Sequence, residues 1–180
     1  MPALPPQLFV VVSGPPGSGK TTLARRLAPQ LGLPLLAKDT IKQALITVLD
    51  VPDVGTSRIV GRASVAALLA VAAEAGSAVL ESVWHRSRAL DDLAALPGHV
   101  VELFCQCDPA VVKQRYAERA GTRHEGHFDT ERSPEELWNE ETARPVAGGW
   151  PVIRVDTTGD VDVPALAGMV ARLAFSLPRR

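Results

Sequence analysis

The sequence predicts an α/β protein in which a parallel sheet of five strands carries helices on both faces. Short apolar runs alternate with amphipathic or alanine-rich stretches along all 180 residues. The first apolar run leads directly into a glycine-rich loop and then into a helical stretch. Because strands that alternate with helices form parallel sheets covered on both sides, both observations favour this fold. The length suits a single domain over residues 1–180.

Apolar runs of strand type, most of them followed by polar or glycine residues, predict the strands: Leu8–Ser13, Leu33–Ala37, Ala78–Leu80 (ending at Glu81), Val100–Cys105 and Val152–Val155. Apolar periodicity and capping residues predict the helices: Thr21–Gln30, a helix capped by Asp39 that carries Ile41, Leu45 and Val48, then Arg58–Ala75, Ser87–Leu96, Pro109–Ala120, a helix starting at Ser133, and Val163–Phe175. The stretch Pro52–Thr56 reads as a loop.

The composition excludes several classes of protein. Hydrophobic residues make up 46% and charged residues 22%, which is typical of a globular domain. A net charge of −1 and 4% aromatic residues argue against nucleic acid and anionic membranes as partners. The apolar run at Leu8 is too short for a signal sequence or a membrane span, so we expect a cytoplasmic protein. Cys105 and Cys107 read as core residues.

A phosphate-binding loop is the strongest motif. The residues Gly14, Pro15, Pro16, Gly17, Ser18, Gly19, Lys20 and Thr21 match G-x-x-x-x-G-K-[ST] between a strand and a helix, and Thr22 follows. The glycines let backbone amides approach phosphate oxygens at a helix N-terminus. Lys20 can reach the β- and γ-phosphates, and the Thr21 hydroxyl can bind Mg²⁺. The motif therefore predicts ATP and Mg²⁺ as cofactors, bound by residues 14–22.

The rest of the chain narrows the class of nucleotide-binding protein. No N-K-x-D pattern follows a later strand, as a GTPase would need for reading the base. The chain is also too short for a transport ATPase and has no extra helical domain of the kind that remodelling ATPases carry. A compact five-strand chain with a polar segment after the fourth strand favours a small kinase.

The sequence resembles the P-loop kinase group that includes chloramphenicol phosphotransferase, zeta toxin and polynucleotide kinase. The resemblance is carried by the loop GPPGSGKTT, the box Asp39-Thr40-Ile41-Lys42 and an arginine-bearing segment after the fourth strand. It implies a three-layer P-loop kinase fold with strand order 2-3-1-4-5. It also implies a lid after the fourth strand, here residues 121–133.

In the resembled group, an aspartate at the place of Asp39 lies beside the acceptor hydroxyl as general base or as the group that orients it. Phosphoryl transfer needs such a carboxylate. A purely structural alternative is that Asp39 only caps its helix. Lys42, one turn along, could hold Asp39 or an acidic substrate group, or could simply be solvated.

Glu81 ends the third predicted strand, next to the phosphate loop, which is the Walker B position. A carboxylate there can hold Mg²⁺ through water. The residues that follow, among them Trp84 and Arg86, are candidates for contacting the acceptor substrate. For Trp84, packing against a helix is an equally plain interpretation.

Arg115, Arg119 and Arg123 lie four residues apart, which places them on one helical stripe leading into the lid. In the resembled kinases, lid arginines stabilise the charge of the transferred phosphoryl group, so Arg119 and Arg123 are candidate catalytic residues. The alternative is an exposed helix face in which Glu118 pairs with the arginines.

Together these observations predict an ATP- and Mg²⁺-dependent kinase that phosphorylates a hydroxyl of a small molecule, an antibiotic being one candidate. Two alternatives remain open from the sequence: a polynucleotide 5′-hydroxyl kinase, and a nucleotide-binding regulatory protein without transferase activity. The chain could be a monomer or a homodimer.

Overall fold

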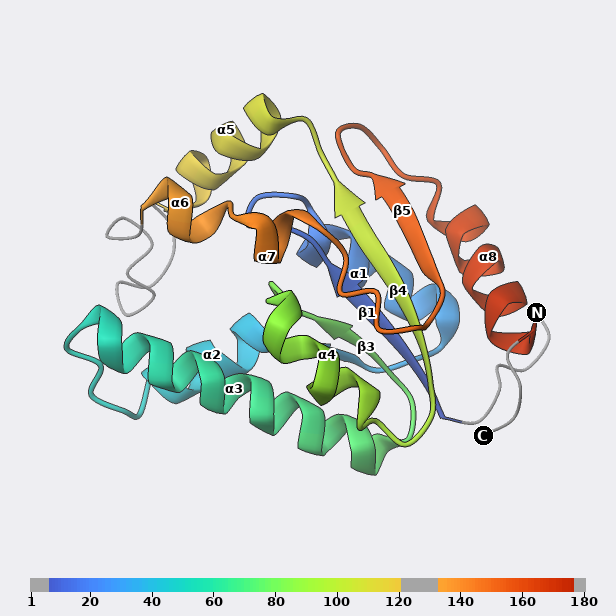
Figure 1. Cartoon of the computed structure of the whole chain (residues 1–180), viewed down its shortest axis with the longest axis horizontal. Helices are drawn as coiled ribbons and strands as arrows, with labels where there is room; N and C mark the ends of the chain where they lie inside the picture. Colours follow the sequence, from blue (N-terminus) through green and yellow to red (C-terminus); the bar gives the residue numbers. More distant parts are fainter. Residues whose placement is uncertain (1–6, 121–132, 177–180) are drawn as a thin grey trace.

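The structure, a computed structural model, describes residues 7–120 and 133–176, with the side chains of residues 119 and 120 left out. Its centre is a five-stranded parallel sheet of order β2-β3-β1-β4-β5 (Figure 1). The strands are β1 (Leu8–Ser13), β2 (Leu35–Ala37), β3 (Ala78–Glu81), β4 (His99–Gln106) and β5 (Val152–Asp156). The predicted fold class and strand order are thus confirmed.

Helices cover both faces of the sheet and its carboxyl edge (Figure 1). They are α1 (Lys20–Leu31), α2 (Lys38–Ile46), α3 (Val54–Ala75), α4 (Arg86–Ala94), α5 (Pro109–Ala120), α6 (Pro134–Leu137), α7 (Glu140–Ala143) and α8 (Val163–Ser176). The α1 and α8 helices share one hydrophobic core with the sheet, and α3 and α4 share the other.

Strand β1 shows why its sequence forms the central strand. All six of its residues are buried. Successive side chains of a strand point to opposite faces, and accordingly Val10 and Val12 join the core under α1 and α8, whereas Phe9 and Val11 join the core under α3 and α4. A continuous apolar run is what a strand needs when both of its faces are covered.

The predicted boundaries around α2 and α3 need correction. Helix α2 begins at Lys38, so Asp39 lies in its first turn and is not its N-cap. Helix α3 begins at Val54, inside the stretch predicted as a loop, because the Asp53 side chain accepts a hydrogen bond from the Thr56 amide at 2.7 Å. A capping aspartate satisfies an amide that the first helical turn leaves without a partner.

Helix α3 is, within the described part of the chain, long and apolar enough to cross a membrane by length and composition. One such helix is weak support for a membrane span. In the structure it lies on the sheet, with Leu68 and Ala72 fully buried in the core it shares with β1 and β3.

Residues 133–150, here called the return segment, lead back from the predicted lid to β5. The predicted start at Ser133 is confirmed, since its side chain accepts from the Glu136 amide, but α6 ends after four residues and α7, which was not predicted, follows. Glu141 of α7 accepts a hydrogen bond from the Ser87 amide of α4 at 2.7 Å. This bond lowers the pKa of the Glu141 carboxyl. The return segment is therefore fastened to α4.

A buried carboxylate holds the other end of the return segment. Glu102, in the middle of β4, is fully buried. It accepts hydrogen bonds from the amides of Val146 and Ala147 at 2.8 and 2.9 Å, from Trp150 Nε1 at 3.1 Å and from Ser13 Oγ at 2.6 Å. Ala147 has a φ of 50°, a strained value for a residue with a Cβ. Its hydrogen bond to Glu102 offsets that strain.

Replacing this carboxylate by an amide should destabilise the fold. In Glu102→Gln the side-chain NH₂ group would face donors, so at least one buried hydrogen bond is lost. We expect the free energy of unfolding to fall by about 1–3 kcal/mol, measured by urea denaturation. Glu74→Gln, on the exposed end of α3, is the control and should change little. Equal stability of the two variants would contradict the role given to Glu102.

Candidate nucleotide and acceptor site

The candidate functional residues converge at the carboxyl edge of the sheet. In the register of the sheet, Glu81 pairs with Val12 on β1 and with Ala37 on β2. The phosphate loop begins two residues after Val12, and Asp39 lies two residues after Ala37. Because parallel strands end at one edge, ligands of such sheets bind there. The fold thus brings Lys20, Asp39 and Glu81 to neighbouring positions of that edge.

Two glycines of the phosphate loop are required by their surroundings. A Cβ on Gly14 would lie 2.7 Å from the carbonyl oxygen of Cys105 in β4. A Cβ on Gly17 would lie 2.5 Å from the carbonyl oxygen of Val112 in α5. Both also have positive φ angles, of 136° and 81°, which L-residues with side chains rarely adopt. The loop is therefore wedged between β4 and α5.

Hydrogen bonds to the loop carbonyls set the direction of its amides. Trp138 Nε1 donates to the Pro16 carbonyl at 3.1 Å, and the Thr157 hydroxyl donates to the Ser18 carbonyl at 2.7 Å. In a trans peptide, the carbonyl and the next amide point in opposite directions. The amides of Gly17 and Gly19 consequently point away from the Trp138 and Thr157 side chains, which leaves them available to phosphate oxygens.

Lys20 is held in the same loop. Its ammonium donates to the Pro15 carbonyl at 2.8 Å, and the residue is almost fully buried. A lysine at the first position of α1, beside the amides of the loop, adds a full positive charge to the partial charge of the helix N-terminus. This arrangement suits a polyphosphate.

The two predicted metal-binding residues lie together. Thr21 Oγ1 donates a hydrogen bond to Glu81 Oε1 at 3.2 Å, and Glu81 is buried. In the described residues, no group of three or more His, Cys, Asp or Glu could hold a metal. Mg²⁺ bound with a nucleotide needs only one or two protein oxygens and completes its shell with phosphate and water. A hydroxyl beside a carboxylate is such a pair.

Asp39 has a cationic neighbour that the sequence analysis missed. Lys38 Nζ lies 3.1 Å from Asp39 Oδ1. For Lys42 the sequence left open a bond to Asp39, a bond to an acidic substrate group, or a solvated position. Lys42 is fully buried and therefore not solvated, and its ammonium donates to Ser57 Oγ of α3 at 2.6 Å. Both lysines lie within one turn of Asp39, so the sequence alone gives no signal for the contact between Lys38 and Asp39.

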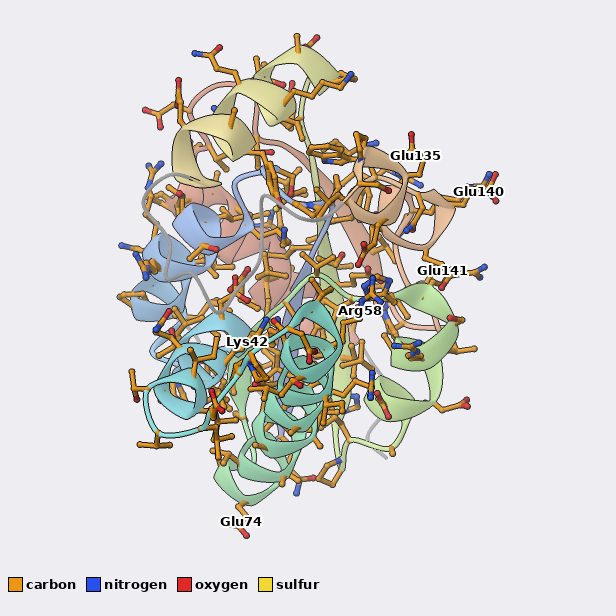
Figure 2. The ribbon with its side chains drawn as sticks, turned by 90° about the vertical axis from the view of Figure 1, so that its left-hand side faces the viewer. Lys42, Arg58, Glu74, Glu135, Glu140 and Glu141 are labelled. Carbon is orange, nitrogen blue, oxygen red and sulfur yellow. The ribbon has the colours of Figure 1, made fainter. Side chains whose placement is uncertain are left out.

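The segment after β3 supplies the other candidate acceptor residues. Trp84 is buried, and Arg86 starts α4 with its Nε donating to the Val146 carbonyl of the return segment at 3.1 Å. Arg58 of α3 forms an ion pair with Glu136 of α6 at 2.9 Å. Figure 2 shows Arg58 at the end of α3 opposite to Glu74, on the side of the return segment. These contacts join the two sides of the carboxyl edge.

The arginine stripe on α5 can be followed only at its start. Arg115 donates to the carbonyls of Thr157 and Thr158 at 2.9 and 3.0 Å, so it fastens α5 to the loop after β5. The side chain of Arg119 and the whole of Arg123 lie outside the described residues, as do positions 121–132 of the predicted lid.

Both cysteines are free, and the prediction of core residues is confirmed for Cys105 but not for Cys107. Cys105 is fully buried under the phosphate loop. Burial raises the pKa of its thiol to about 12. Cys107 is half-buried, with its sulfur 3.5 Å from Arg115 Nη1. Cys105 therefore stays a protonated packing residue at neutral pH.

Comparison with known proteins now identifies the family. The model of the AAA domain family matches residues 9–145. The chain belongs to this AAA domain family. A protein from Chloroflexus aurantiacus, provisionally described as a kinase, is 30% identical, with a TM-score of 0.83 over 94% of this chain and 99% of that one. A comparison with curated proteins finds no match.

Two less similar solved structures share the fold of this chain. A gluconokinase from Sinorhizobium meliloti 1021 is 20% identical, with a TM-score of 0.63 over 94% of each chain. The APS kinase CysC from Mycobacterium tuberculosis, in complex with AMPPNP and APS, is 20% identical, with a TM-score of 0.62 over 96% of this chain and 99% of that one. These two likenesses show the fold, whereas the family match over residues 9–145 and the 30% identical relative support the P-loop kinase-like group that the sequence resembles.

The wedge at Gly17 gives a test of the loop geometry. Gly17→Ala adds both backbone strain and a clash with Val112. Gly32→Ala is a matched control, because Gly32 also has a positive φ, of 65°, but open space around its Cβ position. We expect both variants to lose about 1 kcal/mol or more of stability from strain. Only Gly17→Ala should also weaken binding of an ATP analogue, measured by calorimetry; equal affinities would contradict the wedge.

Proposed function

We propose that this protein is a kinase that uses Mg²⁺ to transfer the γ-phosphoryl group of ATP to a hydroxyl of a small molecule. The observation that carries the proposal is the hydrogen bond between Thr21 and Glu81 beside the Lys20 loop. It joins the helix that follows the phosphate loop to the strand whose neighbour leads to Asp39. A nucleotide-binding part and a candidate acceptor base thus adjoin one another.

The nucleotide half of the site would act through charge and backbone. The amides of the phosphate loop and Lys20 would hold the phosphates and take up charge that develops on the transferred group. Thr21 and Glu81 would hold Mg²⁺, directly or through water. A bound Mg²⁺ ion would supply charge neutralisation at the phosphate oxygens.

Asp39 would act on the acceptor. Its carboxylate would orient the acceptor hydroxyl and take its proton as the bond to phosphorus forms. Lys38 Nζ lies 3.1 Å from Asp39 Oδ1 and forms an ion pair with this carboxylate. The pairing also fixes where the carboxylate lies before substrate binds.

The remaining candidates complete this proposal. Lys42 lies in α2 with Asp39, and Trp84 and Arg86 lie in the segment that follows Glu81, so we assign all three to the acceptor side. Arg119 and Arg123 are proposed to stabilise the transferred phosphoryl group. We also propose a cytoplasmic location, where ATP is available. The 30% identical relative from Chloroflexus aurantiacus, described as a kinase, supports the activity.

The proposal is tested by an acceptor screen with γ-labelled ATP and Mg²⁺. The panel contains sugars, sugar acids, hydroxylated antibiotics, nucleosides and a 5′-hydroxyl oligonucleotide, and one arm has no acceptor. We expect label on one small molecule. Lys20→Ala and Asp39→Asn should each lower that transfer at least a hundredfold, since each removes a charge at the reacting groups.

Lys113→Ala and Asp50→Asn are controls matched in charge, because both residues are exposed. They should transfer label at the wild-type rate. Label on the oligonucleotide would instead identify a polynucleotide kinase. ATP binding without transfer to any acceptor would favour a regulatory protein and would overturn the proposal.

The proposed metal site gives a separate prediction. Glu81→Gln keeps the shape of the side chain but removes its charge, so the affinity for Mg²⁺ should fall about tenfold or more. The readout is the Mg²⁺ concentration at which binding of AMPPNP is half enhanced, followed by calorimetry. Glu118→Gln, on the exposed face of α5, is the control. If Glu81→Gln leaves this Mg²⁺ concentration unchanged, Glu81 does not serve the metal.

A further inference from the structure

The three tryptophans of the chain differ in one respect. Trp138 Nε1 donates to the Pro16 carbonyl, and Trp150 Nε1 donates to Glu102, both at 3.1 Å. Trp84 is 4% exposed, and its Nε1 is fully covered and has no hydrogen-bond partner in the structure. The only other buried side-chain atom of this kind in the described residues is Ser18 Oγ, which lies in the phosphate loop itself.

A buried donor without a partner is costly. It loses its hydrogen bonds to water on folding and gains none in return, a penalty of about 1–3 kcal/mol. Phenylalanine would fill most of the same space without that penalty. Since most buried polar groups in proteins are paired, the Trp84 N–H needs an explanation that packing alone does not give.

The position of Trp84 suggests that explanation. It lies three residues after Glu81, and the register pairs Glu81 with Ala37, two residues before Asp39. Trp84 and Asp39 therefore follow neighbouring strands at the same edge of the sheet. The core that contains Trp84 also receives Leu68 of α3 and, at its margin, Ile41 of α2. The indole thus belongs to the side of the site assigned to the acceptor.

We propose that the Trp84 N–H donates a hydrogen bond to an uncharged oxygen, a carbonyl or hydroxyl oxygen, of the acceptor substrate. This inference rests on the proposed kinase function and specifies its substrate class. The oxygen is uncharged because Trp84 belongs to a cluster of buried apolar side chains, and burying a carboxylate against that cluster would cost far more than one hydrogen bond returns. The acceptor is accordingly a neutral hydroxylated compound with an apolar portion beside this core. The two cations on the acceptor side already donate within the protein, Lys42 to Ser57 and Arg86 to the Val146 carbonyl.

The covered position of Nε1 has a consequence for binding. Because the N–H is fully covered in the structure, the acceptor must displace the atoms that cover it. Binding must therefore change the surroundings of this indole. Trp138, beside the phosphate loop, should respond to nucleotide, and Trp150, bonded to Glu102, should respond to neither ligand. The protein therefore contains its own reference signals.

The test combines kinetics with spectroscopy, using matched probes that differ in charge. D-Gluconamide is compared with D-gluconate, and methyl shikimate with shikimate, beside the neutral amide chloramphenicol. We expect the uncharged probes to be phosphorylated in preference to the charged ones. Trp84→Phe should raise KM for the preferred uncharged probe about fivefold to tenfold, the value of one neutral hydrogen bond, with kcat and the KM for ATP almost unchanged.

Trp150→Phe is the matched control. It removes a paired N–H and should lower thermal stability while leaving the KM for the acceptor unchanged. The second readout uses the wild-type protein, so it does not depend on the folding of a variant. In the ¹⁵N spectrum of the three indoles, addition of the preferred probe in the presence of Mg²⁺ and AMPPNP should shift the Trp84 resonance downfield.

The outcomes separate the two proposals. If a probe is phosphorylated, the kinase function stands. The inference is then overturned by any one of three results: an unchanged KM in Trp84→Phe, an unshifted Trp84 resonance, or a clear preference for the charged probes. The absence of transfer to every acceptor, in this set and in the larger panel, would overturn the kinase function and the inference with it.

Discussion

The parallel pairing of β1 on both of its edges is the constraint on which the site depends. Because β3 and β4 run parallel to β1, the chain leaves all three strands at one edge, and the phosphate loop lies between the segments that follow its neighbours. Glu81 can meet Thr21 for this reason alone, since the two residues are 60 positions apart. A slip of the register by one residue would turn Glu81 to the other face of the sheet.

A second set of contacts fixes the loop from outside. The Trp138 indole and the Thr157 hydroxyl take the loop carbonyls, and α5 passes so close to Gly17 that no side chain fits. The return segment that carries Trp138 is itself held by Glu102, whose carboxylate also bonds Ser13 at the entrance to the loop. One buried carboxylate thus connects the residue before the loop with the segment that carries Trp138.

Features that depend on residues close together in the chain could be predicted from the sequence, and features that depend on distant residues could not. The strand–loop–helix unit around Lys20 depends on neighbours in the chain, and its bounds were predicted within one residue. Asp39 was expected at the carboxyl edge of the sheet, where it lies, but at the N-cap of its helix. Helix α2 begins earlier, at Lys38, so Asp39 lies in the first turn and pairs with Lys38. Trp138 and α7 could not be predicted, since long-range contacts decide both. Glu102 left one usable signal, a lone acidic residue inside an apolar strand.

The two halves of the site therefore differ in how the sequence encodes them. The proposed nucleotide half is formed by consecutive residues, and this loop has the same conformation wherever the motif follows a buried strand. The proposed acceptor half is assembled from α2, α3 and the segment after β3, where Lys42 is bound to Ser57 and Arg58 to Glu136, both residues of other elements. Such a surface can change without disturbing phosphate binding, so one fold can serve several acceptors. Acceptor choice then depends on individual side chains. Selection for stability alone would remove an unpaired buried donor such as the Trp84 N–H, and its presence is explained if it binds the acceptor, as proposed.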